Sequence, residues 1–253
     1  MKKLLICMVC TCLFMSCTSS MEGRDKKIKI AQAIKKEGDV FQSQGNYTAA
    51  LAKHLEAEKM FPNDPYIQNS LGLAYLGKRR YILSAGAFTK AIKEKPDYTE
   101  AKNNLGAAYL RQEKWETAIS QFLLVLDDLI YPTPHFPLAN IGWAYLGMQQ
   151  FAKAQLYFNK ALDEQPGFIT AIHGLAQVFL RTGQTDRAVV YLHNHLKRHP
   201  DAAILHADLA QAYEAKGLRR QAIKAWQLVL KLVSENSSLY RSAENKIITL
   251  QLQ

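Results

Sequence analysis

The stretch that decides the fold is LGLAYLG, residues 71–77, because close copies of it return along the chain. LGAAYLR occupies residues 105–111, and IGWAYLG occupies residues 141–147. The glycines of the first two copies are 34 residues apart, and those of the last two are 36 apart. A small residue followed three positions later by an aromatic one places both on the same face of a helix. The sequence therefore predicts a repeated helical unit with a period near 34 residues.

The same pattern can be followed through six units in register. The small residues and the aromatics three positions later are Gly38 and Phe41, Gly72 and Tyr75, Gly106 and Tyr109, Gly142 and Tyr145, Ala176 and Phe179, and Ala210 and Tyr213. A second small residue and a larger one four positions later follow at Ala50 and His54, Ser84 and Phe88, Ala118 and Phe122, Ala154 and Phe158, Ala188 and Leu192, and Ala222 and Trp226. This order predicts two helices that approach closely at their small residues. Prolines that cannot continue a helix close four of the units, at Pro62, Pro96, Pro166 and Pro200.

Turn residues separate the two helices of each unit. Glycine tolerates a positive φ, so we expect the glycines between the two helices to form the turns at Gly45, Gly77, Gly147, Gly183 and Gly217. Between the third and fourth units, residues 127–137 add two residues and contain three prolines. This junction is either a tolerated insertion or a rigid loop that places Tyr131 and Phe136 beside a binding groove.

The pattern over about residues 31–236 resembles the tetratricopeptide repeat. The resemblance implies an all-α fold, a right-handed superhelix of six helix hairpins in which each unit buries its apolar face against its neighbours. The expected units are residues 31–64, 65–98, 99–134, 135–168, 169–202 and 203–236. Residues 237–253 are expected to form a capping helix with a more polar outer face.

The N-terminus has the features of an export signal. A positive start at Lys2 and Lys3 precedes an apolar stretch that is too short to span a bilayer, so residues 1–16 are predicted to be a signal peptide. The tetrad at residues 14–17, FMSC, resembles a bacterial lipobox, which implies lipidation of Cys17; the alternative is an ordinary signal peptide. Residues 17–30 are then the lipidated cysteine and a polar tether. The resemblance implies an outer-membrane location facing the periplasm, because no aspartate follows the cysteine.

A partner-binding surface is expected on the first helices of the units, which line the concave face in the tetratricopeptide fold. Positions 2, 5, 9, 12 and 13 of each unit should point outward, and the middle units place apolar and aromatic residues there. Together with the junction residue Tyr131, the candidate partner-binding residues are Tyr66, Asn69, Leu73, Leu76, Asn103, Leu110, Phe136, Trp143, Leu146, Gln177 and Leu180. Trp143 is the strongest single candidate, since buried aromatics dominate interface energetics. The alternative is that the leucines and Trp143 only pack between neighbouring helices.

Composition argues against other classes of function. The net charge is +10, but the basic residues are dispersed, so we expect no nucleic-acid partner. All four cysteines lie in the first seventeen residues, which leaves no cysteine for a disulfide or metal site in the repeats. His195 and His199 have a chelating spacing but no nearby carboxylate in ligand spacing, so no metal or other cofactor is predicted. No phosphate loop or nucleophile motif is present, and we expect neither an enzyme nor a small-molecule substrate.

The layout of signal, cysteine, six repeats and final helix resembles the PilF, PilW and Tgl group of type IV pilus lipoproteins. The carrying segments are YPTP at residues 131–134, LANIG at 138–142 and YFNKAL at 157–162. The resemblance implies a pilotin, a scaffold that assists assembly or localisation of the pilus secretin, with secretin subunits as partners. The alternative is a general periplasmic adaptor for another envelope complex, such as one of murein enzymes.

Overall fold

The computed structural model describes residues 2–252, and it describes the side chains of residues 23–252. Within that range all regular structure is helical. The helices are α1 (Lys2–Ser43), α2 (Tyr47–Met60), α3 (Pro65–Gly77), α4 (Tyr81–Glu94), α5 (Thr99–Arg111), α6 (Trp115–Leu126), α7 (His135–Gly147), α8 (Phe151–Glu164), α9 (Ile169–Arg181), α10 (Thr185–Leu196), α11 (Ala203–Ala215), α12 (Arg219–Leu232) and α13 (Ser238–Leu252). The prediction of an all-α fold built from helix hairpins is confirmed.

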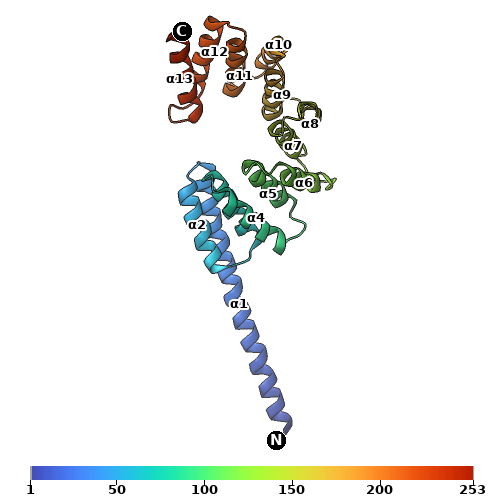
Figure 1. The fold of residues 1–253 in the computed structure, drawn as a ribbon. Coiled ribbons are helices and arrows are strands. Elements are labelled where there is room, and N and C mark those ends of the chain that lie inside the picture. The colour runs from blue at the N-terminus through green and yellow to red at the C-terminus, as the bar shows by residue number, and fades with distance from the viewer. Residues whose placement is uncertain (1, 253) are drawn as a thin grey trace. The chain divides into compact units, whose positions relative to one another are not determined.

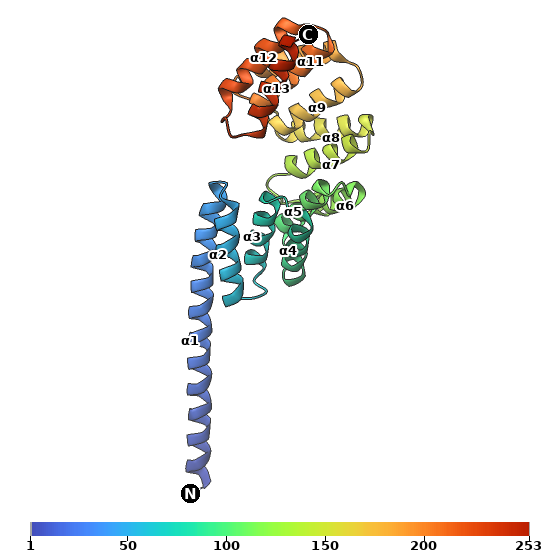
Figure 2. The ribbon, with the colours of Figure 1, turned by 60° about the vertical axis from the view of Figure 1, so that its left-hand side comes forward.

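The first compact unit, unit 1, comprises residues 1–114. Its hairpins are α1 with α2 and α3 with α4, and α5 packs against both α4 and α3 (Figures 1 and 2). The helix α3 begins at Pro65 because the Asp64 carboxylate accepts hydrogen bonds from the main-chain N–H groups of Tyr66 and Ile67, at 2.8 and 2.9 Å. Gly72 lies so close to the Phe88 ring that a Cβ atom there would come within 2.4 Å of it. Small residues on the first helix therefore set the spacing of each hairpin.

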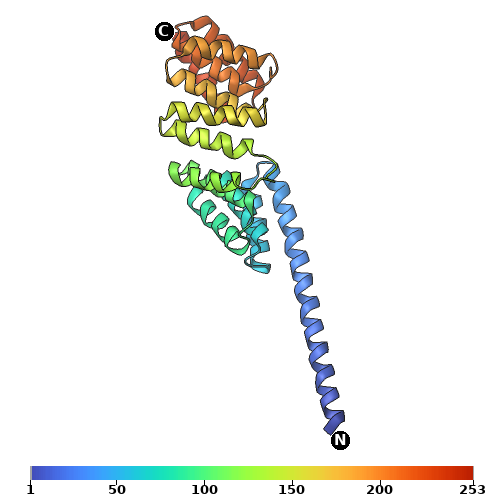
Figure 3. The same ribbon diagram turned by 90° about the vertical axis from the view of Figure 1, so that its right-hand side faces the viewer.

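The second compact unit, unit 2, comprises residues 115–253. It begins with α6 and continues with the hairpins α7 with α8, α9 with α10 and α11 with α12, and α13 packs on α12 (Figure 3). Ala243, Ile247 and Leu250 bury the inner face of α13 against the last hairpin. The Glu214 carboxylate accepts hydrogen bonds from the Trp226 indole and the Lys246 ammonium, at 2.7 and 2.8 Å. This carboxylate links the last three helices.

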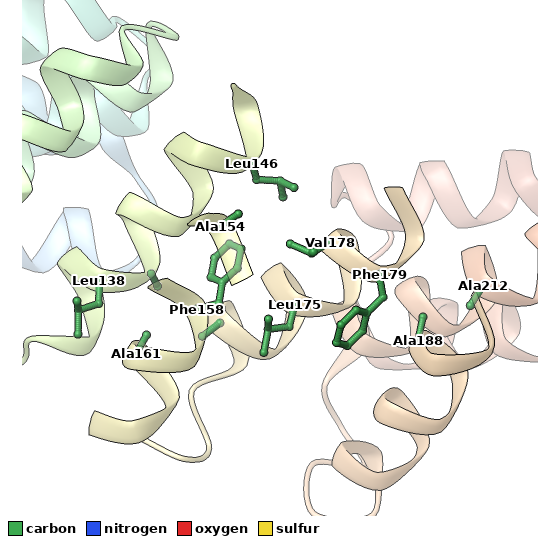
Figure 4. Packing of buried hydrophobic residues seen from close by; sticks show 12 residues of the cluster. Leu138, Leu146, Ala154, Phe158, Ala161, Leu175, Val178, Phe179, Ala188 and Ala212 are labelled. Carbon is green, nitrogen blue, oxygen red and sulfur yellow. The ribbon is translucent and has the colours of Figure 1, made fainter. Parts of the chain in front are cut away.

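The core of unit 2 is organised around Phe158, which is fully buried (Figure 4). Its ring lies between the backbones of α7 and α9: a Cβ added at Gly142 would lie 2.7 Å from it, and one added at Gly174 would lie 2.3 Å from it. Leu175, Val178 and other apolar residues of α9 complete the cluster. Phe158 therefore joins two successive hairpins.

The turn glycines are only partly as predicted. Gly45, Gly183 and Gly217 have positive φ. In the other three repeats, however, the equivalent positions are Arg79, Glu113 and Gln149, with φ of 57°, 59° and 59°. Gly77 and Gly147 are instead the last residues of α3 and α7. A Cβ at these glycines would approach the Tyr47 and Trp115 rings to 2.3 and 2.9 Å. The prediction that Gly77 and Gly147 supply the positive φ is wrong. Each of these glycines instead makes room for an aromatic residue of the preceding repeat.

The helix α1 extends well beyond α2 toward the N-terminus (Figure 1). It includes residues 17–30, for which the sequence predicts a tether, and its exposed part carries Arg24, Lys26, Lys27 and Lys29. Cys17 and the predicted signal peptide, residues 1–16, lie outside the part whose side chains are described. In the described part of the chain, no helix has the length and apolar character needed to cross a membrane. Signal, anchor and tether stay predictions.

Candidate protein-binding surfaces

The first helix of each hairpin, called here the A helix, contacts the A helices next to it. In unit 1 α3 contacts α1 and α5, and in unit 2 α9 contacts α7 and α11. These contacting A helices form what we call the inner wall of each unit. Nearly all the predicted partner-binding residues lie on these inner walls, and the structure shows how far each is buried and what it contacts.

In unit 1, an aromatic pair lies at the start of the A helices. The rings of Tyr66 and Tyr98 meet edge to face with centroids 5.3 Å apart. The Lys95 ammonium donates a hydrogen bond to the Tyr66 hydroxyl at 2.9 Å and lies over both rings. Tyr66 remains 46% exposed, so this pair offers an accessible aromatic surface.

In unit 2, the equivalent positions are again aromatic. The Phe136 and Phe168 rings are 5.1 Å apart and nearly perpendicular, and the His135 ring lies against both. Phe136 is 44% exposed, although it is an entirely apolar side chain. Each unit thus carries an exposed aromatic residue from the first turn of an A helix, supported by the aromatic residue that precedes the next A helix.

Polar side chains cross-link the inner wall of unit 1. The Asn104 amide donates a hydrogen bond to the Asn69 oxygen at 3.1 Å, which ties α5 to α3. Asn69 is 5% exposed and is therefore a structural bridge, with little surface to offer a partner. The side-chain oxygen of Asn103 is buried and has no hydrogen-bond partner within the described residues.

Further along the same helices a cavity of about 700 Å³ opens. Leu73 and Leu76, both predicted as partner-binding residues, line it with Tyr47 and Tyr81. Its other lining residues are Asp39, Gln42, Ser43, Gly77, Arg79 and Arg111. Leu110 is half-buried on α5, the helix that also supplies Arg111. Unit 1 therefore has a hollow with apolar and cationic walls where the sequence predicts a binding groove.

The inner wall of unit 2 contains a buried acid. The carboxylate of Asp208 on α11 is within 2.7 Å of His173 Nδ1 and accepts a hydrogen bond from the Gln177 amide at 2.8 Å. Burial raises the pKa of Asp208, and the contacts with His173 and Gln177 oppose that rise. Trp143 stacks on the His173 ring, with centroids 4.9 Å apart, and meets Phe158 edge to face at 5.4 Å. Trp143 is half-buried, so it joins the core while keeping one part accessible.

The leucines of unit 2 serve mainly as packing. Leu146 is 1% exposed and lies in the Phe158 cluster, so its side chain is not available at the surface. Leu180 is partly buried against the same cluster. The alternative of packing between helices therefore applies to Leu146, whereas Phe136, Trp143 and Gln177 retain accessible surface. Partner binding by these residues stays a prediction.

The proline-rich junction separates its two aromatics. Tyr131 lines a cavity of about 440 Å³ together with Lys160, Asp163 and Glu164 of α8. Phe136 instead contacts Phe168 at the start of α9. Leu129 and Ile130, which precede Tyr131 in the junction, are 96% and 89% exposed, and Leu129 lines the same cavity as Tyr131.

Tyr98, Phe168 and Asp208 are among the residues of these surfaces that sequence reasoning missed. Tyr98 and Phe168 each stand two positions after the proline that closes their repeat, and this shared position could have identified them, although Asp64 and Ala202 occupy it after Pro62 and Pro200. Asp208 could not be found in this way, because its burial depends on side chains from a different hairpin. In the described part of the chain, no group of three or more His, Cys, Asp or Glu side chains is placed to hold a metal ion.

The fold and the inner wall define an all-α helical-repeat scaffold for protein interactions. Family profiles described as tetratricopeptide or TPR repeat match residues 38–78, 71–129 and 145–203. The chain belongs to the tetratricopeptide-repeat proteins. A curated relative, the TPR repeat-containing protein YpiA of Bacillus subtilis, is 23% identical over 80% of this chain. The chain spans 40% of YpiA and 15% of another relative, anaphase-promoting complex subunit 7 of Arabidopsis thaliana.

Solved structures with the same fold match most of the chain. PilW, described as a widely conserved type IV pilus biogenesis factor, has a TM-score of 0.70 at 22% identity, covering 85% of this chain and 98% of PilW. PilF of Pseudomonas aeruginosa has a TM-score of 0.64 at 19% identity, covering 88% and 99%. A tetratricopeptide repeat protein of Parabacteroides merdae has a TM-score of 0.67 at 18% identity, covering 88% and 87%.

Proposed function

We propose that this chain is an outer-membrane lipoprotein, anchored through Cys17 and facing the periplasm, that assists assembly or localisation of a type IV pilus secretin. The fold match with PilW, which extends over 98% of that protein, supports the choice of pathway. The lipobox-like residues 14–17 support the anchor. The observation that carries the binding role is the pair of exposed aromatic residues, Tyr66 and Phe136, on the A helices of the two units.

The proposed mechanism has two steps. The lipid holds the repeats at the membrane and raises their effective concentration near secretin subunits. The inner wall then binds an amphipathic or extended segment of the subunit, using the aromatic pairs as anchors.

The experiment measures heat-resistant secretin multimers in cells that produce variants of the chain. Cys17→Ser removes the anchor, and Phe136→Ser removes an exposed aromatic without opening a buried cavity. Leu156→Ser is the matched control, since Leu156 is 50% exposed on α8, the second helix of its hairpin. We expect fewer multimers with the first two variants and unchanged multimers with the control. Undiminished multimers with both Cys17→Ser and Phe136→Ser would contradict the proposal.

A general periplasmic adaptor is the second candidate. The tetratricopeptide repeat protein of Parabacteroides merdae matches this fold as well as PilF does, with TM-scores of 0.67 and 0.64, so the fold is equally compatible with a general adaptor. Recovery of murein enzymes with the wild-type chain, lost with Phe136→Ser and without any effect on secretin, would select this candidate.

A further inference from the structure

The cavity of unit 1 has an unbalanced charge. Its ionisable lining includes two guanidinium groups, Arg79 and Arg111, and one carboxylate, Asp39. That carboxylate is already engaged, because Lys35 donates to one oxygen at 2.8 Å and the Ser70 hydroxyl donates to the other at 3.1 Å. Neither arginine side chain has an ion pair or hydrogen bond within the described residues. The cavity therefore presents unpaired positive charge.

The main chain at Arg79 is held in a turn. It occupies the turn position with φ of 57°, and its main-chain N–H donates to the Leu76 carbonyl at 2.9 Å. Arg80, the next residue, carries the same charge and is exposed like Arg79, but it does not line the cavity. The equivalent turn in unit 2 has Gln149 with φ of 59°, so glutamine is compatible with this conformation.

The rest of the lining is suited to an extended peptide. Leu73 and Leu76 supply its apolar lining, together with the rings of Tyr47 and Tyr81. Gln42 lines the cavity, and its side-chain oxygen is buried without a hydrogen-bond partner in the described part of the chain, so rotation of the amide toward the cavity would let this oxygen accept a hydrogen bond from a main-chain N–H. The volume of about 700 Å³ is of the size that holds a ligand of a few residues.

We propose that this cavity binds an extended segment of a partner protein in which an aspartate or glutamate side chain adjoins an apolar residue. The carboxylate pairs with Arg79 and Arg111, the apolar side chain covers Leu73 and Leu76, and a main-chain N–H donates to Gln42. Guanidinium–carboxylate pairing supplies geometric specificity as well as attraction. The inference rests on the proposed scaffold function and adds the chemistry that selects the segment.

The test starts from a phage-displayed library of random peptides, flanked on both sides so that no terminal carboxylate is offered. Selection on the full chain in detergent should enrich acidic residues beside apolar ones. A synthetic copy of the best peptide, amidated at its C-terminus, is then titrated by fluorescence anisotropy. Arg79→Gln and Arg111→Gln should each weaken binding about tenfold, as expected for the loss of one charge-assisted hydrogen bond. Arg80→Gln is the matched control and should leave the affinity unchanged.

Two further measurements sharpen the result. Replacing the peptide's acidic residue by its amide should weaken binding to the wild-type chain but not to the Arg79→Gln, Arg111→Gln double variant. Absence of acidic enrichment, or equal affinities of the Arg79→Gln and Arg80→Gln variants, would overturn the inference. Those outcomes leave the scaffold function intact, because that function is tested separately through Cys17 and Phe136.

Discussion

The Phe158 cluster makes a sharp prediction for Gly174→Ala. A Cβ at residue 174 would lie 2.3 Å from the Phe158 ring, more than 1 Å inside the usual carbon–carbon contact of about 3.5–4.0 Å. The ring cannot move away freely, because Gly142 is in contact with it from α7. Overpacking a core costs about 1–3 kcal/mol, and so short a contact belongs in the upper part of that range, about 2–3 kcal/mol, while the better helix propensity of alanine returns about 1 kcal/mol. We expect a net loss of about 1–2 kcal/mol in the free energy of unfolding.

The matched control is Gly86→Ala in α4. A Cβ there meets no atom within 4 Å, and the residue is exposed within the helix. The same chemical change should therefore raise the free energy of unfolding by about 0.5–1 kcal/mol. Urea unfolding followed by circular dichroism at 222 nm measures both variants against the wild type. A shift of the midpoint in the same direction for both would refute the reasoning that glycine serves close approach of Phe158 to α9.

Two other substitutions probe buried polar groups. His54 is fully buried at the position that Phe88 and Phe158 occupy in other repeats. Neither of its ring nitrogens has a hydrogen-bond partner in the described part of the chain, and burial lowers its pKa to about 4. The folded state therefore favours the neutral imidazole. As a result, the free energy of unfolding is highest above pH 6.5 and falls by up to about 3 kcal/mol as the pH drops toward 4. Urea titrations between pH 7 and pH 4 should show a smaller acid loss in His54→Phe; equal losses would show that another group governs the effect. Glu214→Ala leaves the Trp226 indole without its acceptor and should cost about 1–3 kcal/mol, with faster hydrogen exchange in α13. Glu244→Ala, on the exposed face of α13, is its control, and matching exchange rates in the two variants would argue against the link through Glu214.

The hairpins could be predicted because their signals are local. Spacings of three, four and nine residues between small and large side chains determine which faces of two adjacent helices meet. The helices α3, α5 and α7, which begin at Pro65, Thr99 and His135, each open a hairpin pattern of this kind. Residue spacings within one repeat were therefore sufficient to predict the helix hairpins.

The burial and neighbours of individual site residues depend on contacts between successive repeats, and these were harder to predict. The sequence suggests that Gly77 is a turn glycine, but in the structure the ring of Tyr47, thirty positions earlier, packs against it. Leu146 and Phe136 occupy outward positions in the same repeat, yet Leu146 is 1% exposed inside the Phe158 cluster, whereas Phe136 is 44% exposed and rests against Phe168. The pairing of Asp208 with His173 likewise joins residues 35 apart, beyond the reach of a local pattern.

The central claim, that the A helices bind a partner polypeptide, is tested most directly by photo-crosslinking in cells. A benzophenone amino acid is placed at Tyr66 and Phe136 on A helices, and at Leu156 and Val190 on the second helices, all four being exposed. The account predicts crosslinks to a secretin subunit from Tyr66 and Phe136 and none from the other two. Crosslinks to that subunit from Leu156 or Val190 alone would contradict it.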